Sequence, residues 1–510
     1  MWSAIHYGGP PAPAFAQLGE IAIHQKRYEE AVKLLRQSLS FNPDDALVLS
    51  DLAVALRLAG KAGEAAKATS LALEKMPLLP FALAERWRLS PPAAGGPATS
   101  TAGSEWKKIL SYDVQNYLEV AAWYRRLGDA ESVNFILTAA LKDLPSNSLS
   151  PLVYYYLASN ARQEGKTGEA EQRGQQGASA RHEKVFPHRL EDALVLDQAT
   201  RENPTDAHAC YFLGNFLFAL GRYEAASRLW FQALGLGFED SVLYRNLGVH
   251  AWRVKKDLQG AAGFFEKAIE LAPNEYRLYV DLDEIYAQSG DTPRREKLLA
   301  KAPAEVLGRD TVRVRRALFH LQLRQYDQAL EILREHRFKP YEGGEVVRQV
   351  YVASNLEKGR ASLAAGKFRE AEESFRHATE YPENLGVGKP NEPHDEAAYY
   401  WLGEALRAAG DPEGAFRAWE EVAKAGRHTP LPSKAYQPAA LAKLGRSNEG
   451  QRILTDIFAA ASGQEPDATA LYAAGIAEAL VGGTERAAHD FRRALEIDPT
   501  FWPARIELER

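Results

Sequence analysis

The stretch Asp206–Leu236 reads DAHACYFLGNFLFALGRYEAASRLWFQALGL, and Asp240–Pro273 reads DSVLYRNLGVHAWRVKKDLQGAAGFFEKAIELAP. Each stretch shows an apolar helical pattern with a small residue in its middle, then a turn, then a second helical pattern with spaced alanines. The two middle residues, Gly214 and Gly248, are 34 positions apart. A fixed period of this length indicates supersecondary units that stack on one another.

The same middle position recurs along most of the chain, at Gly19, Ala53, Ala121, Ala158, Gly214, Gly248, Asp283, Ala317, Gly359, Gly403 and Gly475. A second small residue follows 12 positions later in most units, at Ala31, Ala65, Ala170, Ala226, Ala329, Ala371, Ala415 and Ala487. Turn glycines follow after seven positions, at Gly60, Gly128, Gly165, Gly221, Gly290, Gly366, Gly410 and Gly482. Small residues let two antiparallel helices approach closely, and glycine makes the tight turn between them. The pattern therefore predicts antiparallel helix pairs along the chain.

Prolines end several second helices, at Pro43, Pro77, Pro145 and Pro499, because proline cannot continue a helix. With this spacing, the order of residues in each unit resembles the signature of the tetratricopeptide repeat (TPR), which reads W/Y, LG, Y, G, A, F, A, P. Eleven units are readable, and two units around Pro80–Tyr112 and Pro432–Ala461 are degenerate. The resemblance implies an all-α fold, a right-handed superhelical α-solenoid of TPR helix–turn–helix units, in one continuous stack.

We divide the chain into seven segments on this basis. They are residues 1–77 (TPR units 1 and 2), 78–113 (a degenerate unit with a Pro/Gly-rich loop), 114–204 (TPR units with an inserted helix), 205–337 (TPR units), 338–425 (TPR units with two inserted loops), 426–465 (a degenerate unit) and 466–510 (the last TPR unit and a C-terminal capping helix).

The period breaks in a few places. Ser90–Ser104 reads SPPAAGGPATSTAGS, which predicts an exposed loop. The gap between Ala158 and Gly214 holds 22 residues more than one period, which predicts an added helix near Arg189–Arg201. Two further insertions, Phe338–Glu345 and Tyr381–Pro393, carry aromatic residues, prolines and glycines, and we expect ordered loops there.

These two insertions carry a second resemblance. FKPYEGGE, PENLG and YWLG (Tyr400–Gly403) are similar to the helical C-terminal half of certain large bacterial proteins. Those proteins join a TPR tail to an N-terminal, β-rich domain of unknown function that is carbohydrate-enzyme-like. The likeness covers Tyr279–Ala425, and it implies a bacterial module that is cut from, or acts beside, a glycan-related protein. The chain has no β-rich half, so the activity of that half is not implied.

Composition excludes several classes of function. The net charge is −6 and the pI is about 6.1, so no basic excess is available for nucleic acid. No apolar run approaches the roughly 18 residues that membrane insertion requires. Residues 1–10 lack the cationic and apolar stretches of a signal peptide, although the chain can also be a fragment whose natural beginning lies upstream. We expect a cytoplasmic protein.

No set of catalytic or metal-binding residues is recognisable. His182 and His188 are six apart, which fits no metal spacing on one helix face, and no HExxH or GxSxG occurs. Gly386–Lys389 lacks the preceding glycine and the following hydroxyl residue of a phosphate loop. Cys210, the single cysteine, is interpreted as a half-buried repeat residue. We therefore expect no enzyme, no cofactor and no metal.

In a TPR array the first helix of each unit lines the concave face, so that inward positions can be counted from the start of a unit. The counted candidates for a ligand or peptide groove are Tyr211, Asn215, Phe218, Arg245, Asn246, Trp252, Arg253, Arg277, Tyr400 and Arg407. Tyrosine and tryptophan are frequent interface anchors, and sugars also stack on such rings. The alternative is that these side chains only link neighbouring helices.

The resemblance also allows a comparison with TPR domains that hold the terminal carboxylate of a peptide. Asn215, Asn246 and Arg277 fall on three of the five clamp positions, but Tyr211 replaces a lysine and Asp281 replaces an arginine. Because an aspartate repels a carboxylate, we favour contacts of Asn215 and Asn246 with an extended peptide backbone over a carboxylate clamp.

Two functional hypotheses follow. The first is a non-enzymatic scaffold that binds a protein or peptide partner in the concave groove of the TPR superhelix. The alternative is an accessory TPR module of a bacterial carbohydrate-active protein, which contributes glycan binding or binds a β-rich partner domain. In the alternative, the loops Phe338–Glu345 and Tyr381–Pro393 make the contacts.

Overall fold

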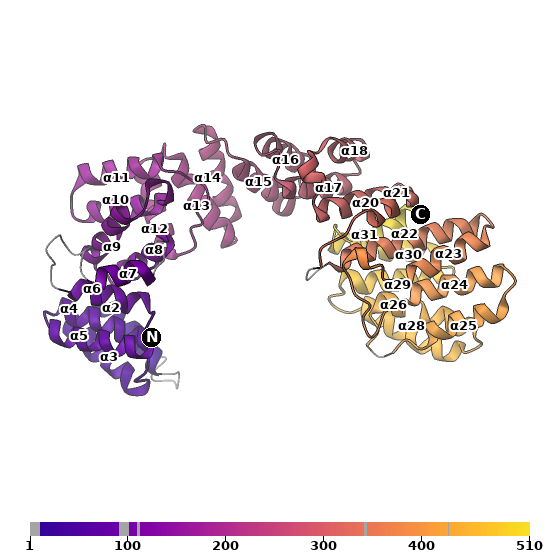
Figure 1. Ribbon diagram of the computed structural model, residues 1–510, viewed down its shortest axis with the longest axis horizontal. Coiled ribbons are helices and arrows are strands. Elements are labelled where there is room, and N and C mark those ends of the chain that lie inside the picture. The colour runs from indigo at the N-terminus through magenta and orange to yellow at the C-terminus, as the bar shows by residue number, and fades with distance from the viewer. Residues whose placement is uncertain (1–10, 91–100, 110–112, 341–343, 427) are drawn as a thin grey trace. The chain divides into compact units, whose positions relative to one another are not determined.

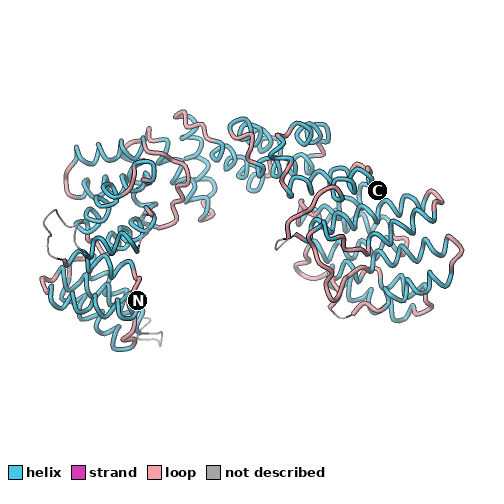
Figure 2. Tube along the Cα trace, in the orientation of Figure 1, coloured by secondary structure: helices cyan, strands magenta, loops and turns pink. Residues whose placement is uncertain are grey.

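The computed structural model describes residues 11–90, 101–109, 113–340, 344–426 and 428–510, and within these ranges the regular structure is helical throughout (Figures 1 and 2). The sequence predicts one continuous solenoid. In the structure the chain divides into two compact units, Met1–Glu239 and Asp240–Arg510, and each is an α-solenoid of stacked helix pairs.

The first unit contains α2 (Pro11–His24), α3 (Tyr28–Phe41), α4 (Ala46–Leu58), α5 (Ala62–Lys75), α6 (Pro80–Leu89), α7 (Thr101–Ile109), α8 (Val114–Arg126), α9 (Ala130–Asp143), η2 (Ser146–Ser148), α10 (Pro151–Gln163), α11 (Thr167–Ser179), α12 (Leu190–Glu202), α13 (Ala207–Ala219) and α14 (Tyr223–Gly235). The helix α12 occupies the insertion after Ala158. The loop expected at Ser90–Ser104 ends earlier than predicted, because α7 begins at Thr101; residues 91–100 lie outside the described residues.

The second unit contains α15 (Ser241–Val249), η3 (His250–Lys255), α16 (Leu258–Leu271), α17 (Tyr276–Ser289), α18 (Thr292–Lys301), α19 (Ala304–Leu307), α20 (Asp310–Gln322), α21 (Tyr326–Arg334), α22 (Glu345–Ala364), α23 (Phe368–Ala378), η4 (Glu383–Leu385), α24 (Glu396–Ala408), α25 (Pro412–Ala423), α26 (Leu431–Lys434), α27 (Gln437–Lys443), α28 (Ser447–Ala461), α29 (Ala468–Leu480), α30 (Thr484–Ile497) and α31 (Trp502–Glu509).

The repeated glycines are the contact points of the helix pairs. A Cβ atom built on Gly359 would lie 2.5 Å from the ring of Phe375, and one on Gly214 would lie 2.6 Å from the ring of Trp230. In both pairs the glycine and the large ring are 16 positions apart. A larger residue at these positions would push the two helices apart, so the small residues fix the helix–helix distance.

At Gly248 the spacing between the glycine and its ring is one residue longer. Its ring partner is Phe265, 17 positions later, and between them His250–Lys255 forms a π-helical turn. A π turn bonds residue i to i+5 and so takes up one more residue than an α turn. The π turn therefore absorbs the extra residue and keeps the small position against the large ring.

The turns between paired helices use left-handed backbone. Eight turn glycines predicted from the sequence have φ between +70° and +91°, which glycine adopts without a steric penalty. In three other turns the left-handed residue is Lys26, Lys256 or Arg324, with φ near +60°. A non-glycine residue is strained there.

Asp283 occupies a position where most units have a small residue. The second small position, 12 residues later, is Arg295, whose Nε donates to Asp283 Oδ1 at 2.6 Å. The Nε of Arg315 donates to Asp283 Oδ2, also at 2.6 Å. The side chains of Asp283 and Arg295 are 0% and 6% exposed, so a buried ion pair replaces the small-residue contact in this unit.

Candidate ligand-binding surface

The inner face of the second unit is the surface formed by the first helices of its pairs, together with α26 and α31. It borders an open cavity of about 760 Å³, which we call the inner cavity. Its walls come from α22, α24, α26, α29, α31 and the segment 381–394, and none of the second helices α23, α25, α28 or α30 contributes to them. A volume of this size lies in the range of ligand pockets.

The two inserted loops are fastened to each other beside this cavity. The backbone N–H of Phe338 donates to the carbonyl oxygen of Asn384 at 2.7 Å. The side-chain amide of Asn384 donates to the carbonyl oxygens of Leu333 at 2.8 Å and His336 at 2.9 Å. Phe338 and Leu385 are both 2% exposed in the same apolar cluster. These contacts hold the start of the second loop in place; residues 341–343 of the first loop lie outside the described residues.

Arg348, on α22, fixes the far end of the second loop. One guanidinium nitrogen donates to Asp395 Oδ1 at 2.7 Å, and the guanidinium lies 3.6 Å from the ring centre of Tyr381. Burial raises the pKa of Asp395, and Arg348 opposes that rise. The arginine therefore joins both ends of the segment 381–395 to the wall of the inner cavity.

The lining of the inner cavity is rich in rings. Its aromatic members are Tyr381, Trp401, Tyr436, Tyr472, Phe501 and Trp502. Its prolines are Pro390, Pro393, Pro430, Pro432 and Pro503. Rigid apolar rings provide a large contact area at a small cost in side-chain entropy. The cavity is therefore suited to apolar or flat groups, with Arg348, Arg360, Glu357 and Glu507 as its buried or half-buried charged members.

The helix α31 lies along this inner face, beside helices that precede it by about 150 residues or more (Figure 1). Arg360, on α22, contacts Glu507 at 3.3 Å and Glu357 at 3.2 Å. Arg510 contacts Glu357 at 2.8 Å and Glu507 at 2.7 Å. These four residues alternate in charge, and we call them the charge square. Burial and the neighbouring Glu357 raise the pKa of Glu507 to about 7, although Arg360 opposes the rise.

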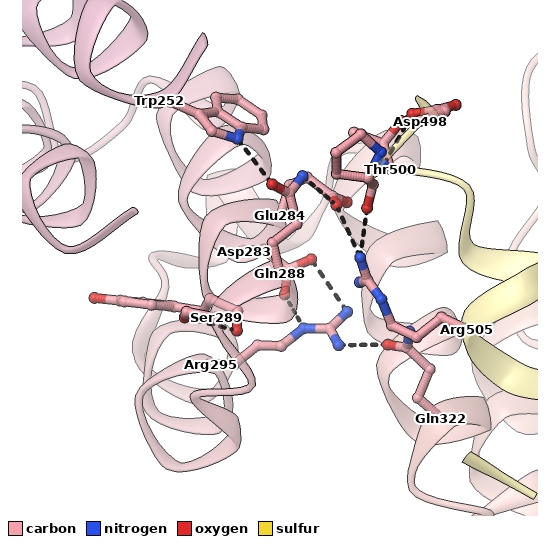
Figure 3. A network of polar contacts seen from close by, with 12 residues as sticks. Trp252, Asp283, Glu284, Gln288, Ser289, Arg295, Gln322, Asp498, Thr500 and Arg505 are labelled. Atoms are coloured by element: carbon pink, nitrogen blue, oxygen red, sulfur yellow. Dashed lines mark hydrogen bonds and ion pairs between the residues drawn. The ribbon is translucent and has the colours of Figure 1, made fainter. Parts of the chain in front are cut away.

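A second polar network joins α31 to the start of the unit (Figure 3). Arg505 lies 3.9 Å from Glu284 Oε1, and Gln288 Nε2 donates to that same oxygen at 3.0 Å. The indole N–H of Trp252 donates to Gln288 Oε1 at 3.0 Å. Side chains of η3, α17 and α31 therefore form one continuous chain of polar contacts on the inner face.

Comparison with known protein families identifies the repeats that the fold shows. A tetratricopeptide repeat family model matches residues 188–237 and 356–430, and a second tetratricopeptide repeat model matches residues 12–45. These segments carry tetratricopeptide repeats. Such repeats imply a protein-interaction scaffold, and TPR folds are generally non-catalytic.

Two solved structures are similar to this chain. The crystal structure of yeast Tom70 is 16% identical, with 89% of this chain and 98% of that chain covered and a TM-score of 0.26. A structure from the functional characterisation of Pseudomonas aeruginosa pilF is 19% identical, with 44% of this chain and 87% of that chain covered and a TM-score of 0.26. At these TM-scores neither structure bears on where this TPR chain binds a ligand.

Three of the predicted groove residues lie on α13 of the first unit. Tyr211 is 5% exposed, and its ring centre lies 5.0 Å from that of Phe238. Asn215 accepts a hydrogen bond from the indole N–H of Trp230 at 3.0 Å. The ring of Phe218 lies 5.1 Å from that of Trp230. All three therefore contribute to packing within the first compact unit, Met1–Glu239.

The predicted residues at the start of the second unit differ in exposure. Trp252 is 5% exposed, whereas Arg253 is exposed and stacks on the Trp252 ring at 3.7 Å. Arg245 lies 3.7 Å from Asp281, and its side chain is 41% exposed. The Arg277 side chain is 67% exposed and lies 3.6 Å from Glu275. Asn246 is half-buried on α15.

The last two predicted residues lie on α24. Tyr400 is 4% exposed, with its ring centre 5.8 Å from that of Tyr436, a residue of the inner cavity. Arg407 is exposed, contacts Glu404 at 2.9 Å and lies 5.7 Å from the ring centre of Trp419. The structure thus places Tyr400 one ring away from the cavity and Arg407 at the surface.

Sequence reasoning singled out the loop Tyr381–Pro393, which lines part of the inner cavity, but it missed the other residues of the cavity and the charge square. Their only visible signals were Arg324 at a position where most units have glycine, and the amphipathic half-unit Phe501–Arg510. No group of three potential metal ligands lies together among the described residues, and none of the described helices has the length and apolar character needed to cross a membrane. Burial raises the pKa of the Cys210 thiol to about 11, which opposes a nucleophilic role.

Proposed function

We propose that this TPR protein is a non-enzymatic scaffold and that it holds an apolar segment of a protein partner in the inner cavity of its second unit. The observation that carries the proposal is the cavity itself, about 760 Å³ on the inner face, with six aromatic residues in its lining. Helical grooves commonly receive partner segments through a few apolar side chains. The cavity has room for such side chains.

The charges of the cavity support an apolar partner segment. Arg348 is paired with Asp395, and Arg360 is paired with Glu357 and Glu507. Because these charges are already balanced, a strongly charged ligand gains little from them and loses its hydration. Apolar side chains, in contrast, gain from burial against the rings.

The exposed arginines at the start of the second unit supply a second part of the proposal. Arg245, Arg253 and Arg277 would add charge-assisted contacts to an acidic part of the partner. Arg277 is the most suitable of these arginines for a test. Its side chain is 67% exposed, so its replacement disturbs the packing of the fold little. The change Arg277→Ala is expected to weaken partner binding without a change in helicity, whereas a loss of helicity would assign Arg277 a structural role.

The alternative function is an accessory module of a bacterial carbohydrate-active protein, which binds a glycan or a β-rich partner domain. The observation that favours it is the position of the loop Tyr381–Pro393, because several of its residues line the inner cavity. Sugars stack on exposed faces of aromatic rings, and Tyr381 stands at this wall. For either function we propose a cytoplasmic location.

The decisive experiment fills the inner cavity. Gly388 lines it, has nothing within 4 Å of a built Cβ atom and has no positive φ, so Gly388→Trp adds a ring without a backbone clash. A matched control is Gly263→Trp on α16, where a built Cβ atom also meets nothing within 4 Å. Both variants and the unaltered chain are tested on a peptide array and on a glycan array.

The scaffold proposal expects peptides that bind the unaltered chain and Gly263→Trp but not Gly388→Trp. Glycans with the same discrimination would favour the accessory module. Partner peptides that bind all three chains equally would place the site outside the inner cavity and overturn the proposal.

A further inference from the structure

The inner face of the second unit already holds a helix. A second cavity, of about 490 Å³, lies on the same face, and it shares Glu357, Arg360, Trp401 and Ile506 with the inner cavity. Trp502, Pro503 and Glu507 of α31 line only the inner cavity, whereas Glu509 and Arg510 line only the second one. The helix α31 therefore lies across one groove and leaves space on both of its sides.

Apolar contacts seat α31 in this groove. Trp502 and Ile506, four positions apart and so on one side of the helix, pack against the buried cluster of α20, α21 and α22. Phe501 and Leu508 pack against the cluster that contains α24 and α29. Ala504 is 0% exposed. The helix is thus held between two walls, in the manner of an amphipathic helix bound in a groove.

Arg324 closes the groove at the end of α31. Its guanidinium donates to the backbone carbonyl oxygen of Glu509 and, at 3.1 Å, to that of Arg510. A cation at the last carbonyl groups of a helix is favourable because these groups lack partners within the helix. Arg324 makes this contact from a left-handed backbone position, φ +60°, where nine other described turns between paired helices have glycine. The strained residue is thus the one that reaches α31.

The contacts of α31 are those of a helix that a competitor can displace from the groove. The helix has eight residues, and an isolated helix of this length is not stable in water. The free spaces beside it are about 760 and 490 Å³, so α31 does not fill the groove. A competing helix that fills more of this space would gain apolar contacts that α31 lacks.

From these contacts we propose that α31 is a displaceable internal occupant of the partner groove and that the partner segment is an amphipathic helix of the same pattern. This inference rests on the proposed function, and it specifies the partner. The partner helix carries an aromatic residue, an aliphatic residue four positions later and a glutamate next to it, as Trp502, Ile506 and Glu507 do. The glutamate meets Arg360, and Arg324 receives the end of the helix.

The test opens the groove in the full chain in two ways. Arg324→Gly removes the contact with α31 and gives the left-handed position the residue that suits it, so the repeat itself is not weakened by strain. Ile506→Asp places a charge against the apolar wall. The matched control is Lys26→Gly, which makes the same backbone change at φ +60° in the first unit. Circular dichroism confirms equal helicity in all chains.

Two readouts follow without any natural partner. Amide hydrogen exchange of residues 504–509 is expected to be about tenfold faster or more in both opened variants, and unchanged in Lys26→Gly. A fluorescent peptide of residues 499–510, PTFWPARIELER, is expected to bind Ile506→Asp at least about tenfold more tightly than the unaltered chain or the control. Arg324→Gly is expected to gain no such affinity, because the peptide loses the same contact with Arg324 that α31 loses.

Unchanged exchange in both opened variants, or no peptide binding to Ile506→Asp, would overturn this inference. Failure of the proposed function is distinguishable from that result. It would appear as unaltered partner binding in Gly388→Trp, whereas the peptide experiment contains no partner.

Discussion

The indole ring of Trp419 lies directly over Gly403, and a Cβ atom built on that glycine would come within 2.3 Å of the indole nitrogen. The two residues face each other across the pair α24 and α25, and Trp419 is 6% exposed. The same relation between a glycine and a large ring recurs at Gly214, Gly359 and Gly475. The distance between paired helices therefore depends on the absence of one methyl group.

Gly403→Ala is expected to destabilise the second unit by roughly 1–3 kcal/mol, since an added methyl group in a filled contact forces rings or helices to shift. Urea unfolding followed by tryptophan fluorescence measures the change. The control Gly263→Ala lies on α16 with open space around a built Cβ atom. It is expected to gain up to about 1 kcal/mol from the higher helix propensity of alanine. Equal stability of the two variants would contradict the packing role of Gly403.

The spacing of small and large residues could be predicted from the sequence because it is local. Each helix pair buries its own small residue against its own large ring, so the pattern repeats every 34 positions in the clearest units. The buried state of Tyr211, Trp252 and Tyr400 was harder to predict. An aromatic residue on a first helix can face the groove or the next repeat, and counting positions does not distinguish these directions.

The position of α31 could not be predicted, because its contacts join residues far apart in the chain. Arg324 and Glu509 are 185 positions apart, and their meeting depends on small rotations that add up from one repeat to the next. A periodic pattern encodes contacts between neighbours only. The local signs are an arginine where nine other turns between paired helices have glycine, and the amphipathic half-unit Phe501–Arg510.

The π turn at His250–Lys255 makes a prediction about deletions. Removal of Lys255 is expected to return the spacing between Gly248 and the next large ring from 17 to 16 and to restore an α turn. The thermal midpoint should then change by less than about 4 °C, the effect of roughly 1 kcal/mol in a unit of this size.

Deletion of Ala408, the last residue of α24, is the control. It shortens a spacing that is already 16 and should lower the midpoint much more. Equal losses would mean that the π turn is not a one-residue insertion.

Asp51 predicts a pH dependence in the first unit. Its carboxyl oxygen Oδ1 accepts the indole N–H of Trp123 at 2.8 Å, and burial, with a smaller contribution from Glu20, raises its pKa from 3.8 to about 8. In the unfolded chain this carboxyl group loses its proton near pH 4, whereas in the folded chain it keeps the proton up to about pH 8. Its contribution to stability is thus complete below about pH 4 and is lost as the pH rises to about 8.

The change Asp51→Asn tests this dependence, since asparagine still accepts the hydrogen bond of Trp123 and does not titrate. Urea midpoints between pH 4.5 and pH 8.5 are expected to fall less steeply in Asp51→Asn than in the unaltered chain. Asp44→Asn is a matched control, because the Asp44 side chain is 71% exposed on the same unit. A slope that is the same in all three chains would show that Asp51 does not titrate in this range.

The raised pKa of Glu507 predicts that the docking of α31 in its groove depends on pH. Burial, partly offset by Arg360 and reinforced by Glu357, raises its pKa from 4.5 to about 7. The released helix loses this proton near pH 4.5, and the docked helix keeps it to about pH 7. Docking is therefore strongest below about pH 4.5 and weakens as the pH rises to about 7. The charged and titratable groups that face Glu507 are Glu357 and Arg360 on α22, Arg510, and the tyrosines Tyr436 and Tyr472.

Glu507→Gln should remove most of this dependence while keeping a side chain of the same size in the charge square. Hydrogen exchange of residues 504–509, corrected for the intrinsic effect of pH, is expected to accelerate between pH 5 and pH 7.5 in the unaltered chain and to change less in Glu507→Gln. Glu496→Gln, exposed on α30, provides the control for the loss of one acidic group. Because the raised pKa weakens docking as the pH approaches 7, a partner helix would displace α31 more easily there. If protection of α31 increased with pH instead, the attraction of Arg360 would outweigh burial, and the sign of this argument would be wrong.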